Sequence, residues 1–85
     1  MARTGTAFGT VVRWDDARGG GVIESAEVPG TCWAEAAAVV HSTGSGVLRA
    51  GQVVQFEWAE PGAGGHLFRA VRVEPREDLQ ASVGG

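Results

Sequence analysis

The clearest alternation of apolar and polar positions lies in residues 51–58. Val54, Phe56 and Trp58 alternate with mainly polar side chains, so a strand here would have one apolar and one polar face. Such a strand is buried on its apolar side only. The pattern therefore predicts that Trp58 belongs to the core.

Four other segments have the β-branched residues and the rough alternation of short strands. They are residues 8–14, residues 19–23, a short stretch through Trp33 and residues 67–73. Alternation within the first of them places Trp14 on the same side as Thr10 and Val12. The alanine-rich run after Trp33 predicts a single helical turn, because alanine favours helix.

Turn residues separate these segments and define the fold class. Residues 15–18, Pro29-Gly30 and residues 61–65 have the composition of turns and loops. The glycines at 19–21 predict a sharp bend, which a tightly coiled barrel requires. Five short strands without a long helical period favour an all-β fold, and in a chain this short a closed barrel protects the sheet edges best.

The two ends of the chain differ in composition from the segment between them. Residues 1–7 are small and polar, which predicts a flexible N-terminus. Residues 74–85 carry charged and small side chains, which predicts a flexible C-terminal tail. We therefore expect one barrel domain over residues 8–73.

Charge and cysteine content narrow the function classes. The basic residues are all arginines, 7 against 10 acidic residues, for a formal net charge of -3. Nucleic-acid-binding proteins usually carry a basic excess, so any such binding here requires a locally basic face. Cys32 is the single cysteine, which excludes an intramolecular disulfide and a zinc site of several thiolates. The lack of a signal peptide or long apolar run predicts a cytoplasmic chain that does not associate with membranes.

Three stretches carry a family resemblance. Residues 13–23 place Arg-Trp before a glycine-rich strand that ends in Val-Ile, and residues 31–39 read Thr-Cys-Trp-Ala-Glu-Ala-Ala-Ala-Val. Residues 48–56 read Leu-Arg-Ala-Gly-Gln-Val-Val-Gln-Phe. These stretches resemble, in order, the first and second RNA-binding motifs and the fourth strand of the cold-shock domain. The resemblance implies a five-stranded antiparallel OB-like Greek-key barrel of cold-shock type, which binds single-stranded RNA or DNA.

The departures from the family lie at its stacking rings. Gly20 and Val22 stand where the family has two aromatic residues, Glu35 replaces a histidine, and Ala36 replaces a phenylalanine. A base stacked on an aromatic side chain contributes about 1–3 kcal/mol. We therefore expect weaker binding than the family frame alone implies.

The resemblance implies a nucleic-acid-binding set made of Arg13, Trp14, Arg18, Trp33 and Phe68. Each has a second interpretation. The two tryptophans stack bases or pack on the barrel wall, and the ring of Phe68 lies exposed beside the binding face or covers the barrel end. The arginines contact phosphates or pair with Asp15, Asp16 and Glu35.

Other chemistry finds little support in the sequence. The glycine run lacks the Gly-Lys-Ser/Thr ending of a phosphate-binding loop, and His41 and His66 have no ligand partners at metal spacing. No nucleophile or base accompanies the Asp15-Asp16 pair, and Cys32 is expected to be a strand hydrophobe. We expect no enzymatic activity, no metal and no cofactor.

Two functions stay open from the sequence. The first is a cold-shock-like module that binds single-stranded RNA or DNA weakly. The second is a degenerate acidic barrel that has lost this binding and interacts with a basic protein partner. Glu35, Asp15 and Asp16 would form its acidic face, with association steered by charge.

Overall fold

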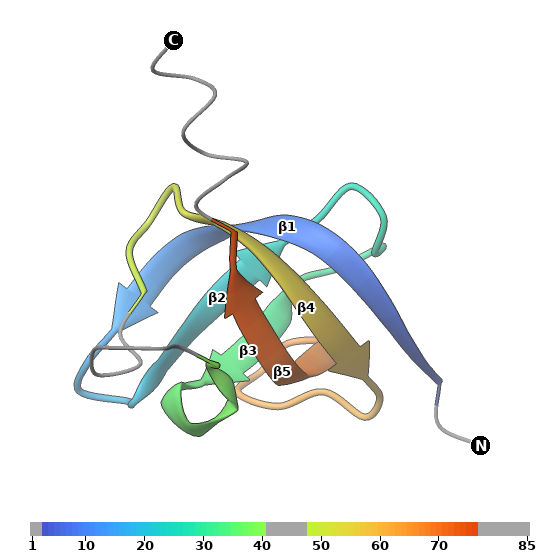
Figure 1. Ribbon diagram of the computed structural model, residues 1–85. Coiled ribbons are helices and arrows are strands. Elements are labelled where there is room, and N and C mark those ends of the chain that lie inside the picture. Colours follow the sequence, from blue (N-terminus) through green and yellow to red (C-terminus); the bar gives the residue numbers. More distant parts are fainter. Residues whose placement is uncertain (1–2, 41–47, 77–85) are drawn as a thin grey trace, which may run out of the picture.

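The computed structural model describes residues 3–40 and 48–76, and Figure 1 shows its five strands and one helical turn. The strands are β1 (Thr4–Asp15), β2 (Gly20–Glu24), β3 (Cys32–Glu35), β4 (Val53–Ala59) and β5 (Phe68–Pro75), and the 3-10 turn η1 spans Ala36–Ala38. Strands and a helical turn were predicted in these places.

The strands close into a barrel in the order β1-β2-β3-β5-β4, with β4 also paired to β1. The predicted all-β, five-stranded, OB-like barrel is confirmed. The expectation of a purely antiparallel sheet is wrong, because β3 and β5 pair in parallel, with Cys32 opposite Phe68. An odd number of strands cannot alternate in direction around a closed ring, so one neighbouring pair must run the same way.

Strand β1 starts earlier than predicted, so residues 4–7 of the expected flexible segment 1–7 lie in a strand, and residues 1–2 lie outside the described part of the chain. Thr4 pairs with Ala59, and the ladder with β4 continues to Thr10. Small residues suit this ladder, since a Cβ added at Gly5 would lie 2.7 Å from the ring of Trp58. Ala7 is buried in the core.

The C-terminal boundary also shifts relative to the prediction of a tail at 74–85. Strand β5 extends to Pro75, and the backbone N–H of Arg76 donates to the carbonyl of Val53 at 3.0 Å. The remaining residues of that predicted tail, 77–85, lie outside the described part of the chain.

A β-bulge in β1 changes which way its last residues point. The register with β2 shifts between Val11 and Arg13, so that Val12 is the extra residue and is exposed. Beyond the bulge Trp14 packs against the core, on the same side as Val11. The predicted grouping of Trp14 with Thr10 and Val12 is therefore wrong, because one inserted residue inverts a two-residue alternation.

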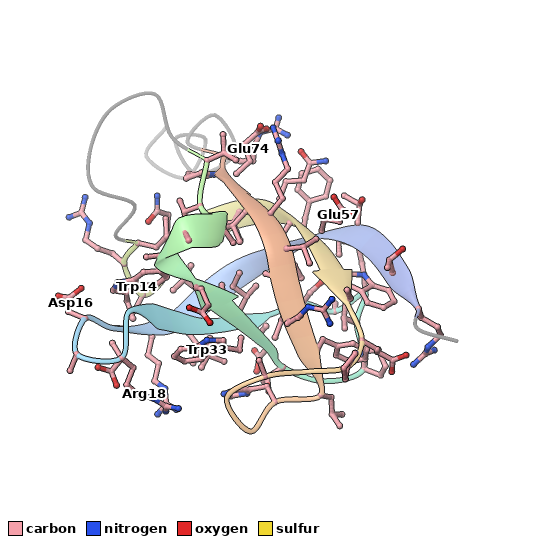
Figure 2. The ribbon with its side chains drawn as sticks, turned by 90° about the horizontal axis from the view of Figure 1, so that it is seen from below. Trp14, Asp16, Arg18, Trp33, Glu57 and Glu74 are labelled. Atoms are coloured by element: carbon pink, nitrogen blue, oxygen red, sulfur yellow. The ribbon has the colours of Figure 1, made fainter. Side chains whose placement is uncertain are left out.

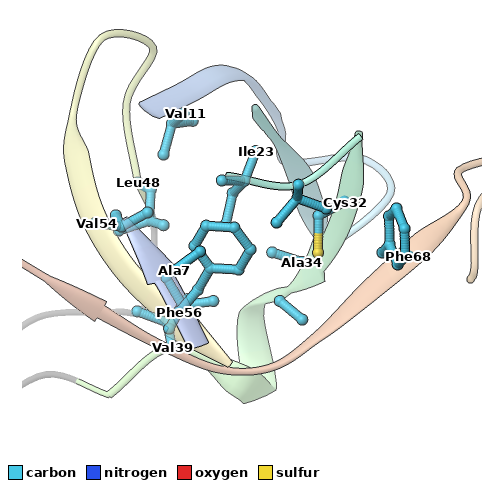
Figure 3. Close-up of a cluster of buried hydrophobic side chains, with 13 residues drawn as sticks. Ala7, Val11, Ile23, Cys32, Ala34, Val39, Leu48, Val54, Phe56 and Phe68 are labelled. Atoms are coloured by element: carbon cyan, nitrogen blue, oxygen red, sulfur yellow. The ribbon is translucent and has the colours of Figure 1, made fainter. Parts of the chain in front are cut away.

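The barrel interior holds one hydrophobic cluster, in which Figure 3 shows the rings of Phe56 and Phe68. Trp58 is half-buried, packs against this cluster and meets Phe68 edge to face, with ring centroids 5.1 Å apart. Its prediction as a core residue is therefore confirmed in part. Cys32 is buried among these side chains, and desolvation raises the pKa of its thiol to about 12. Cys32 is thus a strand hydrophobe, as expected.

In the ranges 3–40 and 48–76, no helix has the length and apolar character needed to cross a membrane.

Candidate nucleic-acid interface

The side chains predicted to bind nucleic acid come from four places in the barrel. Strand β1 carries Arg13 and Trp14, the β1–β2 turn carries Arg18, β3 carries Trp33, and β5 begins with Phe68. Figure 2 shows Trp14 beside Asp16 and Trp33 beside Arg18.

Phe68 does not belong to an interface. Its side chain is 2% exposed and lies in the core cluster, so no base can reach the ring. Leu67 and Val71, by contrast, are exposed. The register between β4 and β5 shifts between Glu57 and Trp58, so that Phe68 and Ala70 on one side of the shift and Val73 on the other all face the core.

Trp33 lies on the outer face of β3, because its neighbours Cys32 and Ala34 point into the core. The side chain is nevertheless only 6% exposed. The ring of His66, from the β4–β5 connection, stacks on the indole at a centroid distance of 6.0 Å and an interplanar angle of 13°. In this structure Trp33 therefore has no free face for a base, which corrects its prediction as an open stacking platform.

Two further contacts complete the cover over Trp33. The guanidinium carbon of Arg18 lies 4.9 Å from the centroid of the indole ring. The backbone of Gly64 approaches so closely that an added Cβ would lie 3.0 Å from Trp33 Cδ2. The outer face of β2 and β3 thus contains a small covered cluster where the resemblance implied an open surface.

Gly20 lies directly beneath the indole of Trp33. A Cβ at that position would lie 2.5 Å from the carbonyl oxygen of Ala34 and 2.7 Å from Trp33 Cζ2. Val22, which pairs with Trp33 across the strands, is also buried. The indole therefore occupies the space above Gly20, one of the two positions at which the resembled family has rings.

Trp14 differs from Trp33 because part of its ring stays accessible. It is half-buried and lines an open pocket of about 380 Å³ at the end of the barrel. The pocket is lined by Arg13, Trp14, Asp16, Leu48, Arg49 and Ala50. An accessible indole and two arginines thus line the same pocket.

Arg49 was not identified from the sequence, because it lies far from Trp14 along the chain. The turn that follows it is fastened to β1: the N–H of Gly51 donates to the carbonyl of Val11, and the N–H of Val11 donates to the carbonyl of Gln52. The Gln52 side chain also accepts the N–H of Arg49 at 3.0 Å. Only this docking brings Arg49 to the pocket.

Within the described part of the chain, the charged side chains around Trp14 form no ion pairs. Across residues 3–40 and 48–76, ion pairs form between Arg3 and Glu60 and between Arg72 and Glu74. The pairing considered for Arg13 and Arg18 with nearby acids is absent from that part of the chain. Asp15 instead caps its own turn, where its Oδ1 accepts the N–H groups of Ala17 and Arg18.

The described residues contain no group of three or more His, Cys, Asp or Glu side chains that could hold a metal ion. His66 Nδ1 and the hydroxyl of Thr31 share a hydrogen bond of 2.6 Å, so this ring is engaged within the protein. His41 lies outside the described residues.

A scan against models of protein families gives no match, and a search of curated proteins finds no similar chain.

Proposed function

We propose that this protein is a cold-shock-like module that binds single-stranded RNA or DNA at the Trp14 end of the barrel. The observation that carries the proposal is the open pocket in which Trp14 lies with Arg13 and Arg49. An indole accepts any base by stacking, and guanidinium groups beside it can contact the phosphates of the same strand.

The proposed binding is weak, for two reasons. Trp33 is covered and Phe68 is buried, so Trp14 remains as the accessible ring of the predicted set. One stacked base contributes about 1–3 kcal/mol, and each phosphate contact is lost progressively as salt rises. Asp16 also lines the pocket and repels phosphate.

The test is a titration of a fluorescein-labelled heptathymidine strand, followed by anisotropy at low and at physiological salt. We expect Trp14→Ala to weaken binding by at least about fivefold, because one stacking surface is lost. Arg49→Gln should weaken binding by about two- to fivefold and make the salt dependence shallower by about 0.7 in log–log slope.

Arg72→Gln is the matched control for Arg49→Gln. It removes the same charge from an exposed arginine that lies on β5 and pairs with Glu74. Equal losses of affinity in the two arginine variants, or unchanged affinity in Trp14→Ala, would show that the pocket is not the binding site.

A second candidate function is favoured by the covered state of Trp33, which removes the face that single strands would use in the resembled family. In this alternative the barrel binds a basic protein segment through acidic side chains such as Glu57 and Glu74, which line a second pocket of about 230 Å³. A flat heptathymidine titration, together with salt-sensitive binding of an oligoarginine peptide that Glu57→Gln weakens, would favour it.

A further inference from the structure

The segment that covers Trp33 is held by side-chain hydrogen bonds that are not part of the barrel's strand pairing. Residues 60–67 connect β4 to β5 and lie outside the barrel ladder. The Thr31 hydroxyl and His66 Nδ1 are 2.6 Å apart, and Arg69 Nη1 donates to the carbonyl of Pro61 at 2.8 Å. Glu60 is fixed to β1, because its N–H donates to the carbonyl of Arg3 at 2.9 Å. The residues after Glu60 are held mainly by these side-chain contacts, so they can move without breaking the sheet.

The chemistry of the cover resembles that of a bound nucleotide. A flat aromatic ring, His66, lies nearly parallel to the indole of Trp33, as a stacked base would. A cation, Arg18, lies over the same indole. His66 and Arg18 thus cover the indole surface on which a base would otherwise stack.

We propose that residues 61–67 form a lid over a second stacking site for single-stranded nucleic acid on Trp33. In the closed state the lid places His66 on the indole; in the open state a base takes the position of His66, and Arg18 turns from the ring to a phosphate. The ligand class rests on the proposed function, whereas the lid itself does not.

Two glycines in the lid provide a matched pair of variants. Gly64 and Gly65 both have positive φ, 60° and 85°. A Cβ at Gly64 would lie 3.0 Å from the indole of Trp33, whereas a Cβ at Gly65 would have nothing within 4 Å. Both alanine variants therefore strain the same loop, and Gly64→Ala alone pushes the loop away from Trp33.

The lid can be measured without any ligand. The protein carries 3 tryptophans, and 5-fluorotryptophan labelling gives each a ¹⁹F resonance that single Trp→Phe variants assign. The shift of each resonance between H₂O and D₂O reports solvent exposure. We expect Gly64→Ala to increase the exposure of Trp33 and Gly65→Ala to leave it unchanged. His66→Ala serves as a second opening variant that adds no strain, and His66→Phe, which keeps a stacking ring, should keep Trp33 covered.

The second site is tested by adding heptathymidine to the same variants. We expect the opening variants to bind at least about fivefold more tightly than the wild type, since one stacking surface is added. The Trp33 resonance should move with ligand in the opening variants. Equal protection of Trp33 in Gly64→Ala and Gly65→Ala would overturn the lid. If Trp33 is exposed but its ¹⁹F resonance does not shift when heptathymidine is added, the second site is overturned.

The outcomes separate this inference from the proposed function. Wild-type binding through Trp14 with no gain in the opening variants would remove the second site and leave the Trp14 pocket. Opening variants that bind through Trp33, when the wild type does not bind at all, would remove the Trp14 pocket and support the lid.

Discussion

The side chains of Arg3 and Glu60 form an ion pair. Arg3 Nε and Nη2 lie 2.9 and 3.0 Å from the two carboxylate oxygens of Glu60, a bidentate geometry. The backbone carbonyl of Arg3 also accepts the N–H of Glu60. The pair closes the start of β1 onto the end of β4, although both side chains are solvated, which limits what it adds to stability.

The pH dependence of this pair has a definite sign. The hydrogen bonds and charge of Arg3 lower the pKa of Glu60 from its ordinary value of 4.5. A depressed carboxylate pKa stabilises the folded state above the ordinary pKa, and this contribution is lost as pH falls through the lowered value. The pKa of Arg3 is raised, outside any range that folding studies reach.

We therefore expect Arg3→Gln to lower Tm slightly at pH 7 and to have a smaller effect at pH 2.5, because protonation of Glu60 weakens its pairing with Arg3 as pH falls. Thermal unfolding followed by circular dichroism at the two pH values measures this. A difference in Tm as large at pH 2.5 as at pH 7 would assign the effect to something other than the carboxylate charge.

At the scale of the element, a glycine on β2 makes room for an aromatic ring on β3. The indole of Trp33 on β3 lies over Gly20 on β2, with no room for a side chain beneath it. The loss of a ring at position 20 is thus tied to how Trp33 lies on the sheet. The glycines of β2 allow strand and indole to approach closely, a role typical of glycine within a strand.

Restoring the family ring by Gly20→Phe should therefore destabilise the barrel. The added Cβ would lie 2.5 Å from a backbone carbonyl, which no rotamer change relieves. We expect a loss of about 1–3 kcal/mol in the free energy of unfolding, the usual cost of overpacking, measured by urea denaturation.

Val12→Phe is the control for Gly20→Phe, because it inserts the same ring at an exposed position of β1. It should change stability by less than about 0.5 kcal/mol. A Gly20→Phe variant as stable as the wild type would mean that the indole of Trp33 moves aside readily and does not need the space above Gly20.

On the scale of the whole molecule, the net charge of -3 hides an uneven distribution. Figure 2 places Glu57 and Glu74 on a different part of the surface from Trp14 and Asp16. Charges separated by more than the Debye length, about 8 Å at physiological salt, are largely screened from one another. A local basic pocket can therefore bind a strand even on an acidic protein.

Two variants with the same change of charge test this distribution. Asp16→Asn, inside the Trp14 pocket, should tighten heptathymidine binding by about two- to fivefold, because a carboxylate near the phosphates is removed. Glu57→Gln should change affinity by less than about 1.5-fold at physiological salt. Equal gains would show that net charge, and not the pocket, controls binding.

The sequence by itself determined the elements and the class of fold. Strands and a helical turn follow from local alternation and turn residues. The side of β4 on which Trp58 packs against the core follows from the uninterrupted alternation before it. These signals are local, so the secondary structure of each segment can be predicted from its own residues. The need to close a small sheet then favours a barrel.

Tertiary structure alone decided which of the predicted site residues are accessible. The bulge at Val12 turned Trp14 toward the core and the pocket, and the β4–β5 connection covered Trp33. Docking of the turn after Arg49 onto β1 supplied the second arginine of the pocket. Bulges, lids and docked turns depend on contacts between residues distant in sequence, and a two-residue periodicity contains no information about them.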